Sequence, residues 1–235
     1  KIDCDFARVD GYLFVPPHES KDILDKERDA INQIGSNVKE ADRAPFSQAF
    51  DTGRCLQFPN QAEFHVLKYL KGLCKIITGM KGEIYTNTVV EEIEDGKVKT
   101  HDGPTLSAKS IIVATCSPIN DRYYIHTKQA AYRTYMIAFK VKKGLIPPGL
   151  YWDTPDPYHY LRVQKKDDKH DWLLVGGEDH RTGQEDKNEL KYSTLEKWAR
   201  KRIAELEEVE FKWSGQVFEP VDSLAFIGKN PHDEN

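Results

Sequence analysis

The segment 110–115, with the sequence Ser-Ile-Ile-Val-Ala-Thr, constrains the fold of this chain more than any other. Its apolar residues are consecutive, whereas a strand with one face in water alternates apolar and polar residues. A continuous apolar strand is expected where both faces are covered, as in a parallel sheet. The segment therefore predicts one buried strand with parallel neighbours.

Most other strand signals indicate antiparallel pairs. Asp10-Gly11 separates two short apolar segments, and this dipeptide suits the type I′ turn of a hairpin. A strand at 83–93 is followed by the turn dipeptides Asp95-Gly96 and Asp102-Gly103, which predict a meander. The remaining predicted strands are 129–141, the hairpin arms 158–165 and 172–176, the strand 209–213, and a short buried strand at 224–228.

Three segments show apolar residues at helical spacing. The first follows residue 22 and ends at Gly35, which is placed to cap it. The second spans 61–77, and the third begins at a capping box formed by Ser193 and Glu196. Together with the strands, these helices predict a mixed α+β fold with a largely antiparallel sheet and flanking helices.

The composition excludes several classes of protein. Hydrophobic residues make up 39% of the chain and aromatic residues 11%, which is typical of a globular protein. The net charge is −4 with both signs spread along the chain, so neither nucleic acid nor a membrane is an expected partner. No apolar run is long enough to span a bilayer, and no signal peptide pattern opens the sequence.

The four cysteines give a further indication of the compartment. Cys4, Cys55, Cys74 and Cys116 form no C-x-x-C pair, and their spacing fits no zinc or iron–sulfur template. We interpret them as reduced thiols of a cytoplasmic protein, although a pair could still meet in space. Glu178-Asp179-His180 lacks a third ligand at recognisable spacing, so no metal site is predicted.

Two segments of the chain resemble one enzyme family. Residues 82–118 combine a strand, Thr-Val-Val-x-x-Ile, a meander and Ile-Ile-Val-Ala-Thr-Cys-Ser-Pro. Residues 213–228 contain Trp-Ser-Gly followed by Asp222 through Ile-Gly. This order resembles the FAD-dependent oxidoreductases of the D-amino-acid-oxidase type, which include glycine, sarcosine and glutamylputrescine oxidases. The sequence looks most similar to members that carry an additional Rieske iron–sulfur domain. This similarity lies in residues 129–135, 152–160, 176–180 and 213–231.

The resemblance implies FAD as the cofactor and suggests residues that contact it. Val90 matches the valine that lies against the FAD adenine, although an ordinary core valine would fit the sequence as well. Ala114, Thr115 and Cys116 match the Ala-Ser/Thr-Gly turn that approaches the cofactor, with a cysteine in place of the glycine.

The resemblance also implies a substrate pocket. Tyr160 and Arg162 share a face of their strand, which in the family forms a wall of that pocket; polar residues facing solvent are the alternative. Arg133 is a further cation near the expected pocket. The arginine that clamps a substrate carboxylate shortly after Trp-x-Gly is missing, because 216–220 reads Gln-Val-Phe-Glu-Pro. An amine, or an acid held elsewhere, is therefore favoured over an amino acid bound in the usual way.

The family fingerprint G-x-G-x-x-G, which places the FAD pyrophosphate at a helix N-terminus, is absent. We therefore expect this chain to be the central portion of a longer enzyme, unable to retain FAD or turn over substrate by itself. Residues 1–58 and 122–221 would form the substrate-binding lobe, and 59–121 and 222–235 part of the FAD-binding lobe. The Cys-x-His and Cys-x-x-His ligands of a Rieske cluster are also absent, so such a domain would lie further along.

Two functions remain open from the sequence. The first is the substrate-binding part of an FAD-dependent oxidoreductase that oxidises an amine or amino acid by hydride transfer to flavin. The second is a non-catalytic interaction module that kept this lobe and lost the cofactor half.

Overall fold

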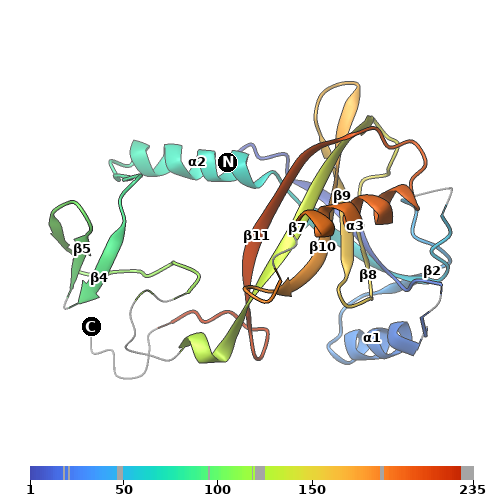
Figure 1. The fold of residues 1–235 in the computed structure, drawn as a ribbon, viewed down its shortest axis with the longest axis horizontal. Coiled ribbons are helices and arrows are strands. Elements are labelled where there is room, and N and C mark those ends of the chain that lie inside the picture. The colour runs from blue at the N-terminus through green and yellow to red at the C-terminus, as the bar shows by residue number, and fades with distance from the viewer. Residues whose placement is uncertain are drawn as a thin grey trace. The chain divides into compact units, whose positions relative to one another are not determined.

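The computed structural model describes residues 1–17, 19–20, 22–46, 50–94, 96–117, 119, 125–185 and 188–228 (Figure 1). Contacts divide the chain into two units, each assembled from two segments. The first unit comprises Lys1–Leu73 and Arg133–Gly215, and the second comprises Cys74–Tyr132 and Gln216–Asn235.

Helices and strands alternate irregularly along the chain. In order they are β1 (Ala7–Phe14), α1 (Asp22–Gln33), β2 (Lys39–Ala41), β3 (Cys55–Glu63), α2 (Val66–Gly79), β4 (Val90–Glu94), β5 (Lys97–Thr100), β6 (Thr105–Ser107), the 3-10 turn η1 (Ile125–Lys128), β7 (Gln129–Lys142), β8 (Leu150–Asp153), β9 (His159–Lys165), β10 (His170–Arg181), α3 (Asn188–Arg200) and β11 (Val209–Pro220). An eight-stranded sheet has the order β11-β7-β10-β9-β8-β1-β3-β2, and a three-stranded sheet has the order β4-β5-β6. The predicted mixed α+β class is confirmed.

The hairpin predicted at Asp10-Gly11 is wrong. β1 runs straight through both residues, pairing antiparallel with β3 and parallel with β8, and its register shifts between Val9 and Gly11. A Cβ on Gly11 would lie 2.9 Å from the indole of Trp152. The glycine therefore lets a tryptophan of the neighbouring strand pack onto β1, rather than turning the chain.

The two faces of the large sheet are covered by different helices. Phe14 belongs to the main hydrophobic core, which also contains Leu195 and Trp198 of α3. Leu13 points the opposite way and packs with Leu24 of α1 in a second cluster, against which Trp152 also packs. Because side chains alternate along a strand, α1 and α3 cover opposite faces of the sheet.

Helix α1 forms where its apolar spacing predicts it and ends as expected. Gly35 adopts φ +69°, and the amide of Ser36 donates to the carbonyl of Ile31 at 3.2 Å. This arrangement satisfies a carbonyl at the end of the helix, and it favours glycine because of the positive φ.

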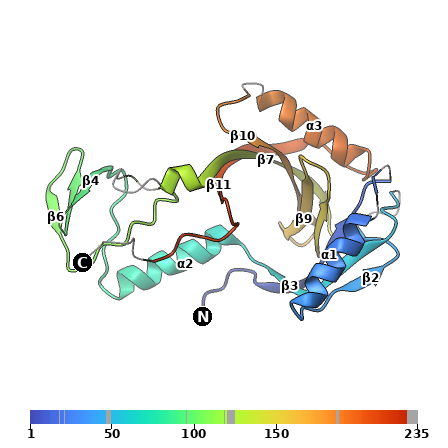
Figure 2. The ribbon, with the colours of Figure 1, turned by 90° about the horizontal axis from the view of Figure 1, so that it is seen from below.

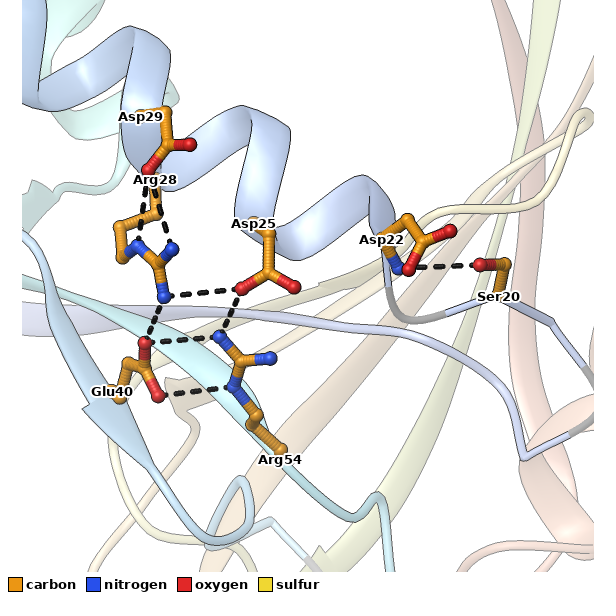
Figure 3. A network of polar contacts seen from close by, with 7 residues as sticks. All are labelled: Ser20, Asp22, Asp25, Arg28, Asp29, Glu40 and Arg54. Atoms are coloured by element: carbon orange, nitrogen blue, oxygen red, sulfur yellow. Dashed lines mark hydrogen bonds and ion pairs between the residues drawn. The ribbon is translucent and has the colours of Figure 1, made fainter.

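A network of ion pairs ties α1 to β2 and β3 (Figure 3). Arg54 of the loop before β3 binds Asp25 at 2.6 Å and Glu40 at 2.9 Å, while Arg28 binds Asp25 at 3.1 Å and also bonds to Glu40. Hydrogen bonds from these arginines, chiefly from Arg54, hold the pKa values of Asp25 and Glu40 below their usual range. All four side chains reach solvent, so the network is screened by salt and contributes little to the stability of the fold.

Two of the predicted helices differ from expectation at their starts. α2 begins at Val66, because residues 61–63 extend strand β3, and none of its residues is buried. α3 begins at Asn188, and Ser193 donates from inside the helix to the carbonyl of Glu189 at 3.1 Å. The predicted capping box is therefore wrong, although the helix itself is confirmed.

The meander at β4, β5 and β6 is confirmed, but three strand predictions in the second unit are wrong or too long. The strand predicted at 83–93 begins only at Val90. Segments 110–115 and 224–228 form no strand, and most of their apolar residues are exposed, with Ile112 89% and Ile227 92% exposed. A strand needs a hydrogen-bonding neighbour as well as apolar residues, and no described residue pairs with either segment.

Candidate functional site

A cavity of about 320 Å³ lies on one face of the large sheet. Across the β8–β9 ladder Trp152 faces Tyr160 and Leu150 faces Arg162, so these four residues share that face. We call it the cavity face, and the one on which α3 packs the α3 face. The cavity is lined by Leu150, Tyr151, Trp152, Tyr158, Tyr160, Leu161 and Arg162.

Tyr160 forms part of the cavity wall and is held by close neighbours. Its ring stacks on Tyr158 with centroids 5.8 Å apart, and its hydroxyl lies 3.5 Å from Oγ1 of Thr134. Gly176 faces it in the register of β9 and β10, and a Cβ there would lie 2.4 Å from the phenol ring. Burial raises the pKa of the Tyr160 hydroxyl, so it stays protonated and can act as a donor at neutral pH.

Arg162 lines the cavity but is already engaged by neighbours. Its Nη2 donates to Oε1 of Gln164 at 3.2 Å, and its Nη1 lies 3.5 Å from Oε2 of Glu63. That oxygen of Glu63 is buried and accepts no hydrogen bond from any residue that the structure describes. Burial raises the pKa of the Glu63 carboxyl, and the guanidinium of Arg162 counteracts only part of the rise.

Arg133 is not among the residues that line the cavity. It precedes Thr134, whose hydroxyl approaches Tyr160 on the cavity face, so alternation directs Arg133 to the α3 face. There its Nη1 donates to Oγ of Ser214 at 3.3 Å. Its assignment to the substrate pocket therefore remains a prediction without support from the geometry.

A bulge in β10 redirects the side chains beyond the cavity. Gly177 has φ +132° and Glu178 has φ +58°, a pair of left-handed residues that interrupts strict alternation. Glu178 consequently turns to the α3 face, where its Oε2 lies 3.7 Å from Nζ of Lys191 in α3. Asp179, the next residue, points to the cavity face, where its carboxylate accepts hydrogen bonds from the hydroxyls of Thr134 and Tyr158.

A buried polar network lies on the α3 face, directly behind the cavity. His159 Nδ1 lies 3.1 Å from Oδ2 of Asp153, and its Nε2 lies 3.0 Å from Oε1 of Glu178. Trp198 donates from its indole to the same Asp153 oxygen at 3.2 Å and stacks on the His159 ring. The side chain of Asp153 is fully buried, where an unpaired charge would be costly, and the imidazole of His159 is its partner.

Opposing effects set the pKa values of this network. Burial by itself lowers the pKa of His159, but the hydrogen bonds to Asp153 and Glu178 outweigh it and raise the pKa above 6.5. The hydrogen bond from His159 lowers the pKa of Glu178 below 4.5, against the effect of burial. These hydrogen bonds therefore favour the charged form of His159 and the charged form of Glu178. Because the network faces away from the cavity, it supports the bulge and β9 rather than contacting a ligand.

The residues assigned to FAD by resemblance lie in the second unit. Val90 is half-buried at the start of β4, whereas Ala114, Thr115 and Cys116 are exposed. Cys116 adopts φ +66°, a conformation that favours glycine, and the resemblance matches it to a glycine of the family. Thr115 Oγ1 donates to the carbonyl of Ser117 at 2.5 Å and closes the turn.

These residues fit a cofactor-approaching turn only in part. The backbone at 114–116 is exposed and bent as the resemblance requires, but Cys116 places a side chain where a bare backbone would approach most closely. No described helix begins at a glycine-rich turn that could cradle a pyrophosphate.

Two further findings concern metals and membranes. Within the described ranges, no group of three or more His, Cys, Asp and Glu side chains is arranged to hold a metal ion. Among those same residues, no helix combines the length and apolar character needed to cross a bilayer.

Sequence reasoning missed Trp152, Glu63 and Asp179 as neighbours of the cavity. Trp152 and Asp179 lie within segments that carry the resemblance, but nothing in those segments marks them as cavity residues, and Glu63 comes from β3, far away in the sequence. The double glycine Gly176-Gly177 was the one available signal, since glycine inside a strand marks a bulge or a close approach.

Comparison with known proteins agrees with this architecture. Residues 1–235 match the family described as DAO: FAD dependent oxidoreductase. The fold is similar to that of glycine oxidase from Geobacillus kaustophilus, with a TM-score of 0.82 and 14% identity over 99% of this chain and 65% of that chain. It is also similar to L-proline dehydrogenase from P. horikoshii, with a TM-score of 0.75 and 15% identity over 97% of this chain and 65% of that chain.

The protein belongs to the DAO family of FAD-dependent oxidoreductases. In sequence it is similar to the putative Rieske 2Fe-2S iron-sulfur protein YhfW of Bacillus subtilis (strain 168), with 28% identity over 239 residues. That match covers 100% of this chain and 46% of the relative, so the chain spans about half the length of this curated relative.

Proposed function

We propose that this chain forms the substrate cavity and one part of the FAD site of an enzyme that oxidises an amine or amino acid by hydride transfer. The observation that carries this proposal is the aromatic cavity on the sheet face where Tyr160 and Arg162 meet. Family membership, and the names of the similar glycine oxidase and proline dehydrogenase, support an amine or amino acid as substrate.

The chemistry divides between cofactor and protein. When bound, FAD accepts a hydride from a C–H bond next to nitrogen. The residues of the cavity would orient that bond and exclude water, because Trp152, Tyr158 and Tyr160 present aromatic surface with few polar groups. Arg162 can neutralise a carboxylate only in competition with Glu63.

In the second unit, Val90 would contact the adenine, and Ala114, Thr115 and Cys116 would approach the cofactor. The exposed apolar side chains of 110–115 and 224–228 support this proposal, since Ile112 and Ile227 stand 89% and 92% in solvent. Surfaces of this kind are normally covered by a further part of the protein or by a ligand. We propose that polypeptide carrying the pyrophosphate site covers them in the whole protein.

The similarity to a relative named for a Rieske cluster supports a second part of the proposal. We propose that the whole protein also contains a Rieske [2Fe–2S] domain, which would take electrons from the reduced flavin. Absorption and electron paramagnetic resonance spectra of the whole protein would show such a cluster if it is present.

Flavin content provides the direct test of the proposed function. We expect the whole protein to be purified with FAD, seen as its visible absorption bands, and residues 1–235 expressed alone to retain almost none. Reduction of the bound flavin by small primary and secondary amines or amino acids, under exclusion of oxygen, would identify the substrate class. A whole protein without flavin, and unable to bind added FAD, would refute the proposal and favour the non-catalytic interaction module.

A further inference from the structure

The bulge in β10 turns the carboxylate of Asp179 toward residues that line the cavity. Gly177 and Glu178 turn the strand so that Asp179 points to the cavity face. There the hydroxyls of Thr134 and Tyr158 approach the Asp179 carboxylate, and Tyr160 lies near enough to feel its charge. Tyr158 and Tyr160 line the cavity, and Asp179, which is not itself among the lining residues, lies next to the hydroxyl of Tyr158.

One oxygen of this carboxylate is without a partner. Oδ1 of Asp179 is buried and forms no hydrogen bond with the described residues. A buried acceptor left unpaired is costly, and more so if it is charged, so native proteins rarely keep one without a use. Burial also raises the pKa of the Asp179 carboxyl, and the Thr134 and Tyr158 hydroxyls offset only part of that rise.

The rest of the cavity suits the cationic end of a ligand near Asp179. Aromatic faces attract ammonium groups, and Trp152, Tyr158 and Tyr160 supply three of them. Arg162 lines the same cavity on the strand position two residues after Tyr160, and Glu63 partly neutralises it. The negative partner for an ammonium group is therefore Asp179. The part of the ligand near Arg162 would be neutral or acidic.

We propose that Asp179 receives the nitrogen of the substrate, which makes a protonated amine the ligand class of this cavity. This inference rests on the proposed function. The ammonium would donate a hydrogen bond to Oδ1 of Asp179, and the side chain of Tyr158, whose residue is 40% exposed, would turn aside to admit it. The proton then passes from nitrogen to Oδ1, so that R–NH3⁺ and a carboxylate become R–NH2 and a carboxylic acid. No electrons move in this step, and the neutral amine that it leaves has the free lone pair that hydride loss requires.

The test compares charged and neutral ligands in the whole protein. Calorimetry would measure binding of benzylamine and propylamine, and of the neutral benzyl alcohol and 1-propanol, to wild type and to Asp179→Asn. Loss of a charge-assisted hydrogen bond predicts a weakening of about 10- to 100-fold for the amines alone. Asp168→Asn is the matched control, because it removes the same charge from the exposed tip of the β9–β10 hairpin, and it should change neither ligand class.

Two results of these binding measurements would contradict a role of Asp179 in amine recognition. Equal weakening of amines and alcohols would mean that Asp179 only shapes the cavity, and unchanged binding of amines would remove it from recognition altogether; either result overturns the inference. Asp179→Ser provides a second variant if the asparagine variant fails to fold, with the same expectation. A wild type that carries FAD but binds neither amine would refute the inference alone, whereas a wild type without FAD would refute the proposed function.

Discussion

Gly177→Ala should be among the most destabilising single substitutions in this protein, lowering the free energy of unfolding by about 2–5 kcal/mol. A Cβ at this position would lie 2.1 Å from the carbonyl oxygen of Tyr158 and 3.0 Å from Cα of His159. Both are backbone atoms, which cannot move without breaking the pairing of β9 and β10. The φ of +132° adds strain, since side chains rarely adopt this conformation. Urea unfolding followed by circular dichroism would measure the loss.

Gly176→Ala is the matched control for this prediction. Its Cβ would also meet an atom at 2.4 Å, but that atom belongs to the ring end of Tyr160, which can rotate aside. We expect a cost below about 1.5 kcal/mol, together with weaker ligand binding because a cavity wall has moved. If both variants lose the same free energy of unfolding, the close approach of the Tyr158 carbonyl to Gly177 is not what requires a glycine there. The direction of Asp179 would then need another explanation.

His159→Leu should cost about 3–5 kcal/mol of stability, because it removes the cationic partner of buried Asp153 and leaves Glu178 with Lys191 alone. Asp153 is fully buried, and only 11% of the Glu178 side chain is exposed, so water cannot replace the imidazolium. His170→Leu, in the hairpin tip, is the control. Its partner Asp167 is solvent-exposed, and the change should stay within about 0.5 kcal/mol.

The same network predicts how stability varies with pH. The pKa of His159 is raised above 6.5 on folding, so its contribution is complete below pH 6.5 and is lost as the pH rises through the folded value. The pKa of Glu178 is lowered below 4.5, so its contribution is complete above pH 4.5 and is lost as the pH falls. The contribution is therefore greatest between pH 4.5 and 6.5.

Unfolding measured at pH 5.5 and at pH 8.5 tests this pH dependence. The wild type should lose stability relative to His159→Leu at the higher pH, since only the wild type has the imidazolium to lose. A difference between the two proteins that is the same at both pH values would show that folding does not raise the pKa of His159, and a wild type that gains stability at pH 8.5 would show that the folded protein holds His159 neutral.

Several local features of the fold could be predicted from the sequence. The spacing of Leu24 and Ile31 with Gly35 behind them defined α1, because a helix and its cap depend on residues within a few turns of one another. The turn residues of the β4–β6 meander and the hairpin of β9 and β10 were predicted for the same reason. Alternation along β9 also placed Tyr160 and Arg162 on one face correctly.

The wrong predictions concern segments whose state depends on distant partners. Asp10-Gly11 has the composition of a turn, yet β3 and β8 pair on both sides of it and keep the chain extended. The apolar run 110–115 has the composition of a buried strand, yet no described strand lies beside it to accept its hydrogen bonds. Composition reports what a segment can bury, whereas pairing requires a neighbour that the segment itself does not specify.

The sequence by itself determined the family motifs, the α+β class and the strand that carries Tyr160 and Arg162, because these follow from contacts among near neighbours in the chain. Only the tertiary structure decided which carboxylates meet the cavity. Asp179 contacts Tyr158 of the cavity wall beyond a bulge where the amide of Glu178 donates to the carbonyl of Tyr158 at 3.3 Å, and Glu63 contacts Arg162 from β3. The network around His159 likewise joins β8, β9, β10 and α3. Such meetings depend on register and bulges, which set the direction of each side chain only when the whole sheet has formed.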